Sequence, residues 1–261
     1  MEKQHVKVWD LPTRLFHWLL VLLTIGAFVT GFLASEPAYT DFFIRFMGRA
    51  QLDAHSLFGS AIAGLLVFRL VWGVIGSTYA RFTQFVSGPA RILAYLRGQW
   101  HGLGHNPLGA FSVLGFLALM SFQVGTGLVM DSEAPFTGNL NALMSKTLNA
   151  LLSHDNAALV SQNIAKSSVG LHIFTVWLIV GLVSLHTLSI IFYAVVKKNN
   201  LLFPMFTGYK AIDDPTLKPA HGGGWLAFIV AALIAAGAVW AANGGLNPPP
   251  PPPPPQTAPA W

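Results

Sequence analysis

The chain has 261 residues, of which 53% are hydrophobic and only 10% are charged, and its formal net charge is +5. So few charged residues cannot cover the surface of a water-soluble domain, and the composition therefore excludes that class and indicates an integral membrane protein. In such a protein the positive charge reflects membrane topology, and it gives no reason to expect nucleic acid as a partner.

Five apolar stretches are long enough to cross the hydrocarbon of a bilayer, near residues 15–34, 57–75, 108–130, 168–196 and 225–242. The first follows a short basic segment, as a secretory signal does. Its apolar run is longer than that of a signal, so we expect it to be retained. The expected fold class is an all-α membrane protein with five transmembrane helices, the last of them C-terminal.

The basic residues predict how these helices are oriented. Ten of them fall on one side, namely Lys3, Lys7, Arg14, Arg81, Arg91, Arg97, Lys197, Lys198, Lys210 and Lys218. Only four fall on the other side, namely Arg45, Arg49, Lys146 and Lys166. Because Lys and Arg concentrate in cytoplasmic loops, we expect a multi-pass membrane protein with a cytoplasmic N-terminus and a C-terminus on the opposite side of the membrane.

The sequence contains no cysteine, which excludes covalent c-type haem, thiolate-bound iron–sulfur clusters and disulfides. Any redox cofactor must therefore be held noncovalently, and histidine is the obvious ligand. His172 and His186 lie fourteen residues apart in one apolar span, so both project from the same helix face with roughly 21 Å of rise between them. Ionisable side chains are costly in a membrane helix, and imidazole ligates haem iron. The alternative is that each histidine only hydrogen-bonds to a neighbouring helix.

Depth in the membrane groups four histidines into two pairs. His17 lies near the cytoplasmic end of the first span, and His55 opens the second span at the outer face. Because the fourth span runs from outside to inside, His172 matches His55 in depth and His186 matches His17. This match predicts two stacked noncovalent haems b, each with two histidine ligands. The other histidines fall in tails or loops and are expected to be solvated, namely His5, His101, His105, His154 and His221.

One formal charge lies well within a span. Arg69 follows His55 by fourteen residues, on the same helix face and near the depth of His186. It is expected to pair with a haem propionate or, alternatively, to snorkel to the cytoplasmic headgroups. Glycines near the histidines would let a flat macrocycle approach the backbone, although they also suit ordinary contacts between membrane helices. These glycines are Gly59, Gly125, Gly127 and Gly170.

Several segments together resemble the bacterial cytochrome b561 family, which includes the cytochrome b subunits of nickel–iron hydrogenase and of formate dehydrogenase. They are WDLPTRLFHW at 9–18, AHSLFG and FRLVWGVIGS within 54–77, ARFTQFVSGP at 80–89, GHNPLG at 104–109 and the two histidines of the fourth span. The resemblance covers about residues 6–198. It implies a bundle of four helices around two haems, with ligands from helices one, two and four. It thus places the ligand roles on His17, His55, His172 and His186.

Three parts are expected along the chain. Residues 1–198 form the haem domain, 199–242 form a cytoplasmic loop and the fifth helix, and 243–261 form a proline-rich tail. The eight consecutive prolines of the tail form a stiff polyproline II rod of roughly 25 Å. The segment 131–167 is expected to lie outside as a loop, where it either docks a periplasmic partner or covers the outer haem.

The expected function is that of a diheme b-type cytochrome of the bacterial inner membrane that transfers electrons between the quinone pool and a periplasmic redox partner. Its C-terminus is then periplasmic. A c-type cytochrome is the favoured partner. The alternative within this class is the membrane anchor and electron-transfer subunit of a hydrogenase or formate dehydrogenase, and quinone oxidoreductase activity is left open. Two alternatives from other classes bind no haem, namely a transporter or proton relay that uses the intramembrane histidines and a structural assembly subunit. A Soret band in the visible spectrum is expected of the cytochrome functions and not of these two alternatives.

Overall fold

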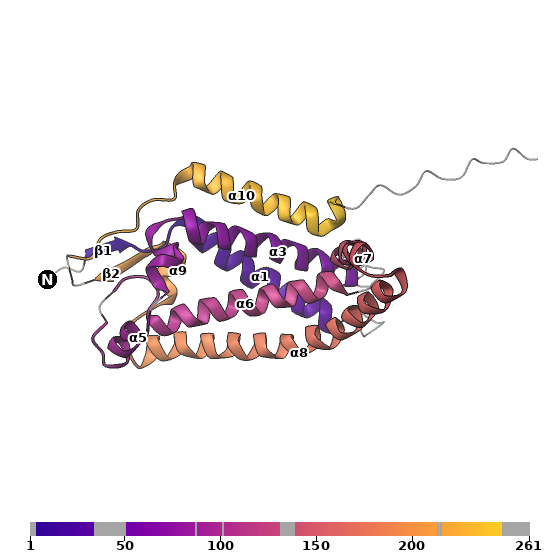
Figure 1. Cartoon of the computed structure of the whole chain (residues 1–261). Coiled ribbons are helices and arrows are strands. Elements are labelled where there is room, and N and C mark those ends of the chain that lie inside the picture. Colours follow the sequence, from indigo (N-terminus) through magenta and orange to yellow (C-terminus); the bar gives the residue numbers. More distant parts are fainter. Residues whose placement is uncertain are drawn as a thin grey trace, which may run out of the picture.

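The computed structural model describes residues 4–33, 51–86, 88–100, 102–130, 139–212, 214 and 216–246. Four long helices lie side by side, namely α1 (Leu11–Leu33), α3 (Gln51–Ile75), α6 (Pro107–Val129) and α8 (His154–Val195). A fifth helix, α10 (Gly224–Trp240), lies against α3 on the outside of this bundle (Figure 1). All five are long and apolar enough to cross a membrane, which confirms the predicted all-α membrane fold.

Polar side chains mark where α1 and α6 begin. The backbone N–H of Thr13 donates to Asp10 Oδ1 at 2.9 Å, and the backbone N–H of Gly109 donates to Asn106 Oδ1 at 2.7 Å. Each side chain satisfies a backbone N–H that has no partner within its own helix. Pro107 occupies the first turn of α6, where a missing N–H costs nothing. The residues directly before α6 therefore have a defined place relative to the bundle.

Short elements gather at one end of the bundle, which we call the β1 end. Strand β1 (Gln4–Lys7) pairs antiparallel with β2 (Tyr209–Ile212), which follows the short helix α9 (Leu202–Thr207). Next to this sheet, the Nε1–H of Trp18 donates to the Met205 carbonyl at 3.1 Å, and its ring stacks on Phe206. The N-terminal segment is thereby held against the chain that follows α8.

Three short elements connect α3 to α6. They are η1 (Thr78–Ala80), α4 (Phe82–Phe85) and α5 (Pro89–Leu96). Near the end of this connection, Gly104 has a φ of +79°, a left-handed conformation that glycine adopts without strain. A Cβ on Gly104 would also approach the Tyr79 ring at 3.2 Å. Glycine therefore lets this connection turn closely past η1 just before α6 starts.

The segment predicted as an outer loop is largely helical, and this part of the prediction is wrong. Helix α7 covers Asn139–Leu151, and α8 already begins at His154. With 42 residues, α8 is about 63 Å long at 1.5 Å per residue, roughly twice the thickness of the hydrocarbon core. Its first turns therefore extend beyond the predicted span. Residues 131–138 lie outside the described part of the chain.

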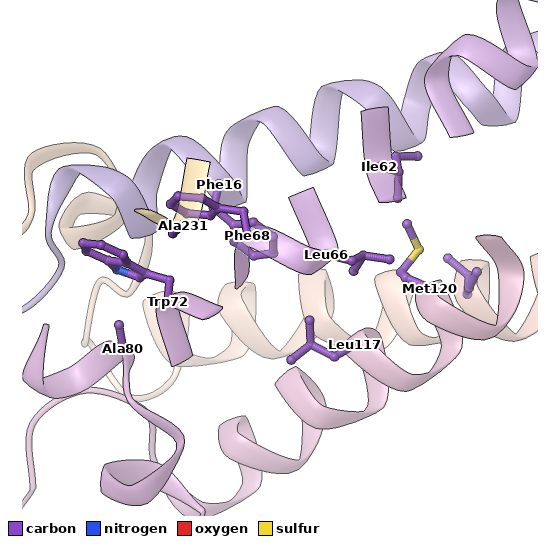
Figure 2. Close-up of a cluster of buried hydrophobic side chains, with 10 residues drawn as sticks. Phe16, Ile62, Leu66, Phe68, Trp72, Ala80, Leu117, Met120 and Ala231 are labelled. Carbon is purple, nitrogen blue, oxygen red and sulfur yellow. The ribbon is translucent and has the colours of Figure 1, made fainter. Parts of the chain in front are cut away.

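The largest hydrophobic cluster joins side chains from all five long helices (Figure 2). Its buried members are Phe16, Ile62, Leu66, Phe68, Trp72, Ala80, Leu117, Met120, Ile179 and Ala231. Helix α10 packs closely on α3 because a small residue allows the approach: a Cβ on Gly64 would overlap with the Val239 side chain. This fifth helix therefore covers α3 rather than entering between the other four. The proline tail from residue 247 onward lies outside the described residues.

Candidate functional site

The structure brings His55 and His172 together, and we call them the outer pair. His55 lies on the second turn of α3 and His172 lies on α8, and their ring centres are 6.1 Å apart with the ring planes at 77°. Imidazole nitrogens bind metals at about 2 Å, so two rings on opposite sides of one metal ion have centres roughly 6 Å apart. The observed separation therefore suits two ligands of a single metal centre.

The orientation of His55 is set by the backbone of α1. Its Nδ1 lies 2.8 Å from the carbonyl oxygen of Ala27 and 3.4 Å from Thr30 Oγ1. A carbonyl oxygen only accepts hydrogen bonds, so Nδ1 carries the proton and donates it to Ala27. The Nε2 lone pair is then free to bind a metal, an arrangement that is typical of histidine ligands.

The orientation of His172 is set by α6 in a similar way. Its Nδ1 lies 3.0 Å from Thr126 Oγ1, and the Thr126 hydroxyl in turn lies 2.9 Å from the Gln123 carbonyl oxygen. Because the hydroxyl donates its proton to that carbonyl, its oxygen accepts from His172. His172 is therefore also protonated on Nδ1, which leaves its Nε2 available as a ligand.

Glycines give the outer pair its room. A Cβ on Gly31 would lie 2.9 Å from Cε1 of His55, and a Cβ on Gly127 would lie 3.2 Å from Cε1 of His172. Sequence reasoning named Gly127 but missed Gly31, which is separated from His55 by more than twenty residues. A Cβ on Gly59 or Gly125 would meet nothing within 4 Å, although both residues are partly buried. Beside the outer pair the bundle therefore has open space that could cradle a flat group.

Gly170 is not part of the packing around the outer pair. It was named with the other glycines because it precedes His172 by two residues on α8. In the structure Gly170 is exposed, and a Cβ on it would meet nothing within 4 Å. A position two residues from His172 points to a different side of the helix, which explains the difference.

His17 and His186, which we call the inner pair, are close enough to interact electrostatically. Both side chains are partly buried, His17 on α1 and His186 on α8. His17 packs edge-on against Trp18 at 4.9 Å, and the Phe116 ring meets His186 edge-on at 5.6 Å. The Nδ1 atom of His17 is buried and finds no hydrogen-bond partner among the described residues. The inner pair is thus less tightly assembled than the outer pair.

Arg69 is buried in the bundle, with only 3% of its surface exposed. Its guanidinium carbon lies 5.0 Å from the centre of the Phe82 ring and 5.7 Å from that of Phe85, within the range of cation–π contacts. Its Nη1 is buried and has no hydrogen-bond partner among the described residues, although Asp10 is near enough to act on it electrostatically. A side chain that snorkels to the headgroups would be exposed at its tip, so this geometry favours an internal partner.

His105 is only partly exposed and its Nδ1 is buried, so the prediction that this residue is solvated is wrong. Its ring lies 4.6 Å from the Trp9 ring and 4.9 Å from the Phe85 ring, and its Nδ1 is buried without a hydrogen-bond partner in the described part of the chain. Burial, followed by the charge of Arg69, lowers the pKa of His105 to about 3. Sequence reasoning missed this position because a loop residue shows no helical periodicity. The environment depends on rings that lie far away in sequence.

The remaining histidines contribute nothing to either pair within the described structure. His5 on β1 and His221 before α10 are both exposed, as predicted. Residue 101 and the side chain of His154 lie outside what the structure describes.

A second polar group lies at the β1 end and was not predicted. The hydroxyl groups of Tyr95 and Tyr193 are hydrogen-bonded to each other, and Asn106 Nδ2 donates to Tyr193 Oη at 3.2 Å. Burial and this hydrogen bond raise the pKa of Tyr95 to about 12. Tyr193 follows His186 by two helical turns on α8, so the group ties α5 and the start of α6 to the helix that carries both His172 and His186.

The donor set fits haem better than a free metal ion. Within the described residues, no group of three or more histidine, aspartate or glutamate side chains is arranged to hold a metal. The outer site instead offers two opposed imidazoles beside open space. That is what a metal needs when a planar macrocycle already supplies its other four ligands.

A family model matches most of the chain. The family model described as "Prokaryotic cytochrome b561" matches residues 8–208 of the chain. A search of the solved structures finds no match.

Several curated proteins are similar to the chain. One is the "Probable Ni/Fe-hydrogenase 1 B-type cytochrome subunit" of Escherichia coli, which is 26% identical over 48% of this chain and 60% of its own length. Another is the "Probable Ni/Fe-hydrogenase B-type cytochrome subunit" of Cupriavidus necator, which is 25% identical over 79% of this chain and 87% of its own. A protein of that same description from Rhizobium leguminosarum is 30% identical over 51% of this chain and 62% of its own. Because the family model covers most of the chain, the chain belongs to the prokaryotic cytochrome b561 family.

Proposed function

We propose that the chain is a diheme b-type cytochrome that carries electrons across a bacterial inner membrane, between the quinone pool and a periplasmic redox partner. Membership of the cytochrome b561 family implies haem b as the cofactor. The observation that carries the proposal is the outer pair, in which two histidines 6.1 Å apart both keep Nε2 available. The N-terminus lies in the cytoplasm and the C-terminus in the periplasm, since basic residues concentrate at the β1 end.

In this proposal His55 and His172 would hold the iron of the outer haem. The Ala27 carbonyl and the Thr126 hydroxyl each accept the Nδ1–H of one ligand, which keeps the imidazoles in position and increases their basicity. The bound haem supplies reversible one-electron chemistry at its iron. The surrounding helices exclude water and provide the low-dielectric environment that contributes to the redox potential.

His17 and His186 are the proposed ligands of the inner haem. His172 and His186 lie on one face of α8 with roughly 21 Å of rise between them, which is most of the hydrocarbon thickness. The two sites together therefore span the insulating part of the membrane. Near the inner pair, Arg69 offers a buried positive charge to a haem propionate, because its Nη1 still lacks a hydrogen-bond partner among the described residues.

The relatives favour one kind of redox partner over another. Those named above are described as Ni/Fe-hydrogenase cytochrome subunits. We therefore propose a hydrogenase as the periplasmic partner, with the c-type cytochrome as the alternative and quinone as the other electron carrier. In either case the partner docks at the end of the bundle formed by α7 and the first turns of α8, close to the outer pair.

The cofactor assignment is tested by counting haems in the purified chain. A pyridine haemochrome assay should give two noncovalent haems b per polypeptide. His55→Ala and His172→Ala should each remove the same spectral component and leave the other intact, and His17→Ala and His186→Ala should remove the second one. A chain with no Soret band would support the transporter or scaffold alternatives. Loss of one component in both His55→Ala and His17→Ala would refute the pairing.

The direction and partner are tested in proteoliposomes that contain the full chain. Quinol added to the membrane should reduce both haems, and an electron acceptor or donor added outside should exchange electrons first with the component that His55→Ala removes. A hydrogenase with hydrogen and a soluble c-type cytochrome can be added in turn. If the c-type cytochrome reduces the haems and the hydrogenase with hydrogen does not, the hydrogenase is excluded as partner.

A further inference from the structure

The loop between α5 and α6 places His105 within electrostatic range of the inner pair. The Trp9 and Phe85 rings flank its imidazole at 4.6 Å and 4.9 Å. The next residue, Asn106, caps α6 through its side chain, which fixes the backbone on one side of His105. His105 is therefore a positioned group and not a surface histidine, and the proposed function leaves it without a role.

His105 shares the Phe85 ring with Arg69, whose guanidinium carbon lies 5.7 Å from the centre of that ring. Each of the two side chains has a buried nitrogen that lacks a hydrogen-bond partner among the described residues, Nη1 of Arg69 and Nδ1 of His105. Buried polar groups are nearly always hydrogen-bonded, so each of these two atoms indicates a polar partner beyond the described residues. Their common neighbour, the Phe85 ring, lets one bound group serve both.

Asp10, the acid that acts on Arg69 electrostatically, does not satisfy this requirement. Asp10 accepts the backbone N–H of Thr13 through Oδ1 at 2.9 Å and the Nε1–H of Trp72 through Oδ2 at 3.1 Å. Asp10 acts on Arg69 electrostatically, yet Nη1 of Arg69 has no hydrogen bond to any residue that the structure describes. Among those residues, no group therefore accepts a hydrogen bond from this nitrogen.

The chemistry of the two side chains selects a carboxylate. Arg69 provides a positive charge and several N–H donors that match a carboxylate well. Burial and the neighbouring Arg69 lower the pKa of His105, so at neutral pH its imidazole is uncharged and has one N–H to donate. His17 and His186 both lie within electrostatic range of His105. A carboxylate at this position would thus lie beside the proposed ligands of the inner haem.

We propose that His105 and Arg69 together bind one carboxylate, and that this carboxylate is a propionate of the inner haem. The inference rests on the proposed function, since it requires a haem between His17 and His186. His105 acts as a positioning residue: it hydrogen-bonds the propionate and does not ligate the iron. A free carboxylate or another small anion is the competing source of the same chemistry.

The test compares variants of the full chain by redox titration of its visible spectrum. His105→Phe keeps a ring between Trp9 and Phe85 but removes both nitrogens, and His105→Gln keeps an N–H donor. His105→Phe should lower the midpoint potential of the inner haem and leave the outer one unchanged, because a propionate with fewer donors stabilises the ferric state. His105→Gln should restore most of the potential. The exposed His5→Phe is the control and should change neither potential.

Two further measurements show whether the bound carboxylate is a haem propionate or a free anion. In the double variant with Arg69→Gln, the shift should be smaller than the sum of the two single shifts, because both residues act on one group. When the chain is produced without haem and loaded with haem dimethyl ester, wild type and His105→Phe should have the same inner potential. A difference that persists with the ester would identify a free anion and overturn the proposal.

The inference and the proposed function fail in different ways. A wild-type chain that holds no inner haem overturns the proposed function. Two haems with the same inner potential in wild type and His105→Phe overturn only the role of His105. If His105→Phe loses the inner haem, the midpoint potential of the inner haem in His105→Gln decides the question. A potential equal to that of wild type supports the hydrogen bond from residue 105. A potential lowered as far as in Arg69→Gln refutes it.

Discussion

The substitution Gly31→Ala tests whether the orientation of His55 controls the binding of the proposed outer haem. The new Cβ would lie 2.9 Å from Cε1 and 3.0 Å from Nδ1 of His55. Carbon atoms in contact are normally about 3.5–4.0 Å apart, so the imidazole must move by about 0.5 Å or more. The bond from Nδ1 to the Ala27 carbonyl, 2.8 Å long, lies at the point of contact and would be lengthened or broken.

The size of the effect follows from the role of that bond. Loss of a group that orients a metal-binding histidine typically costs about 10- to 100-fold in metal affinity, or about 1.4–2.7 kcal/mol. We expect Gly31→Ala to lower the affinity for the outer haem by this factor, and to leave the inner haem unchanged. The affinity is measured by titration of haem into the haem-free chain, followed at the α-band of each component.

Gly181→Ala on α8 is the matched control. A Cβ at this exposed position would meet nothing within 4 Å, so both haems should bind as in wild type. Wild-type affinity of Gly31→Ala for both haems would refute the argument that the orientation of His55 matters. If Gly31→Ala instead lost the spectral component of the inner haem, the assignment of His55 to the outer pair would be wrong.

Three further predictions concern the cradle, the β1 end and pH. Gly59→Ala should weaken the outer haem although a Cβ there meets no protein atom within 4 Å, and unchanged binding would argue against a cradle at this position. Trp72→Phe removes the donor to buried Asp10 and should lower the free energy of unfolding by about 1.5–3 kcal/mol. Thermal unfolding in detergent measures this loss, and Trp177→Phe, an exposed position, should change little. Because the pKa of Tyr95 is raised to about 12, stability from this group is present below pH 10 and falls as the pH rises towards 12. In a pH titration followed by tyrosinate absorbance, Tyr95→Phe should therefore lack the ionisation near pH 12 and keep the ionisations near pH 10.

The sequence by itself determined the class of fold and predicted which ligand candidates share a depth. A backbone in lipid must satisfy its own hydrogen bonds, so a long apolar run can only be a helix, and five such runs were found in the right places. Histidine within those runs is costly and therefore conspicuous. With the direction of each helix, depth alone predicted that His55 lies opposite His172, and their rings lie 6.1 Å apart.

Hydropathy alone could not predict the helices at the end of the bundle where α7 lies. Helix α7 and the first turns of α8 are mixed in polarity, so no apolar run identified them, and the segment was expected to be a loop. Such helices are stabilised by packing against each other, which depends on how α6 and α8 are arranged in space.

Only the tertiary structure decided what surrounds each histidine. The groups that hold the outer pair, Ala27 and Thr126, belong to helices other than those of the ligands, and a carbonyl has no signature in the sequence. The same is true of His105, whose environment combines Trp9 from before α1 with Phe85 from after α3. Hydropathy and periodicity are properties of neighbouring residues along the chain. A binding site is formed by residues that are distant in sequence, and their meeting depends on how the helices pack.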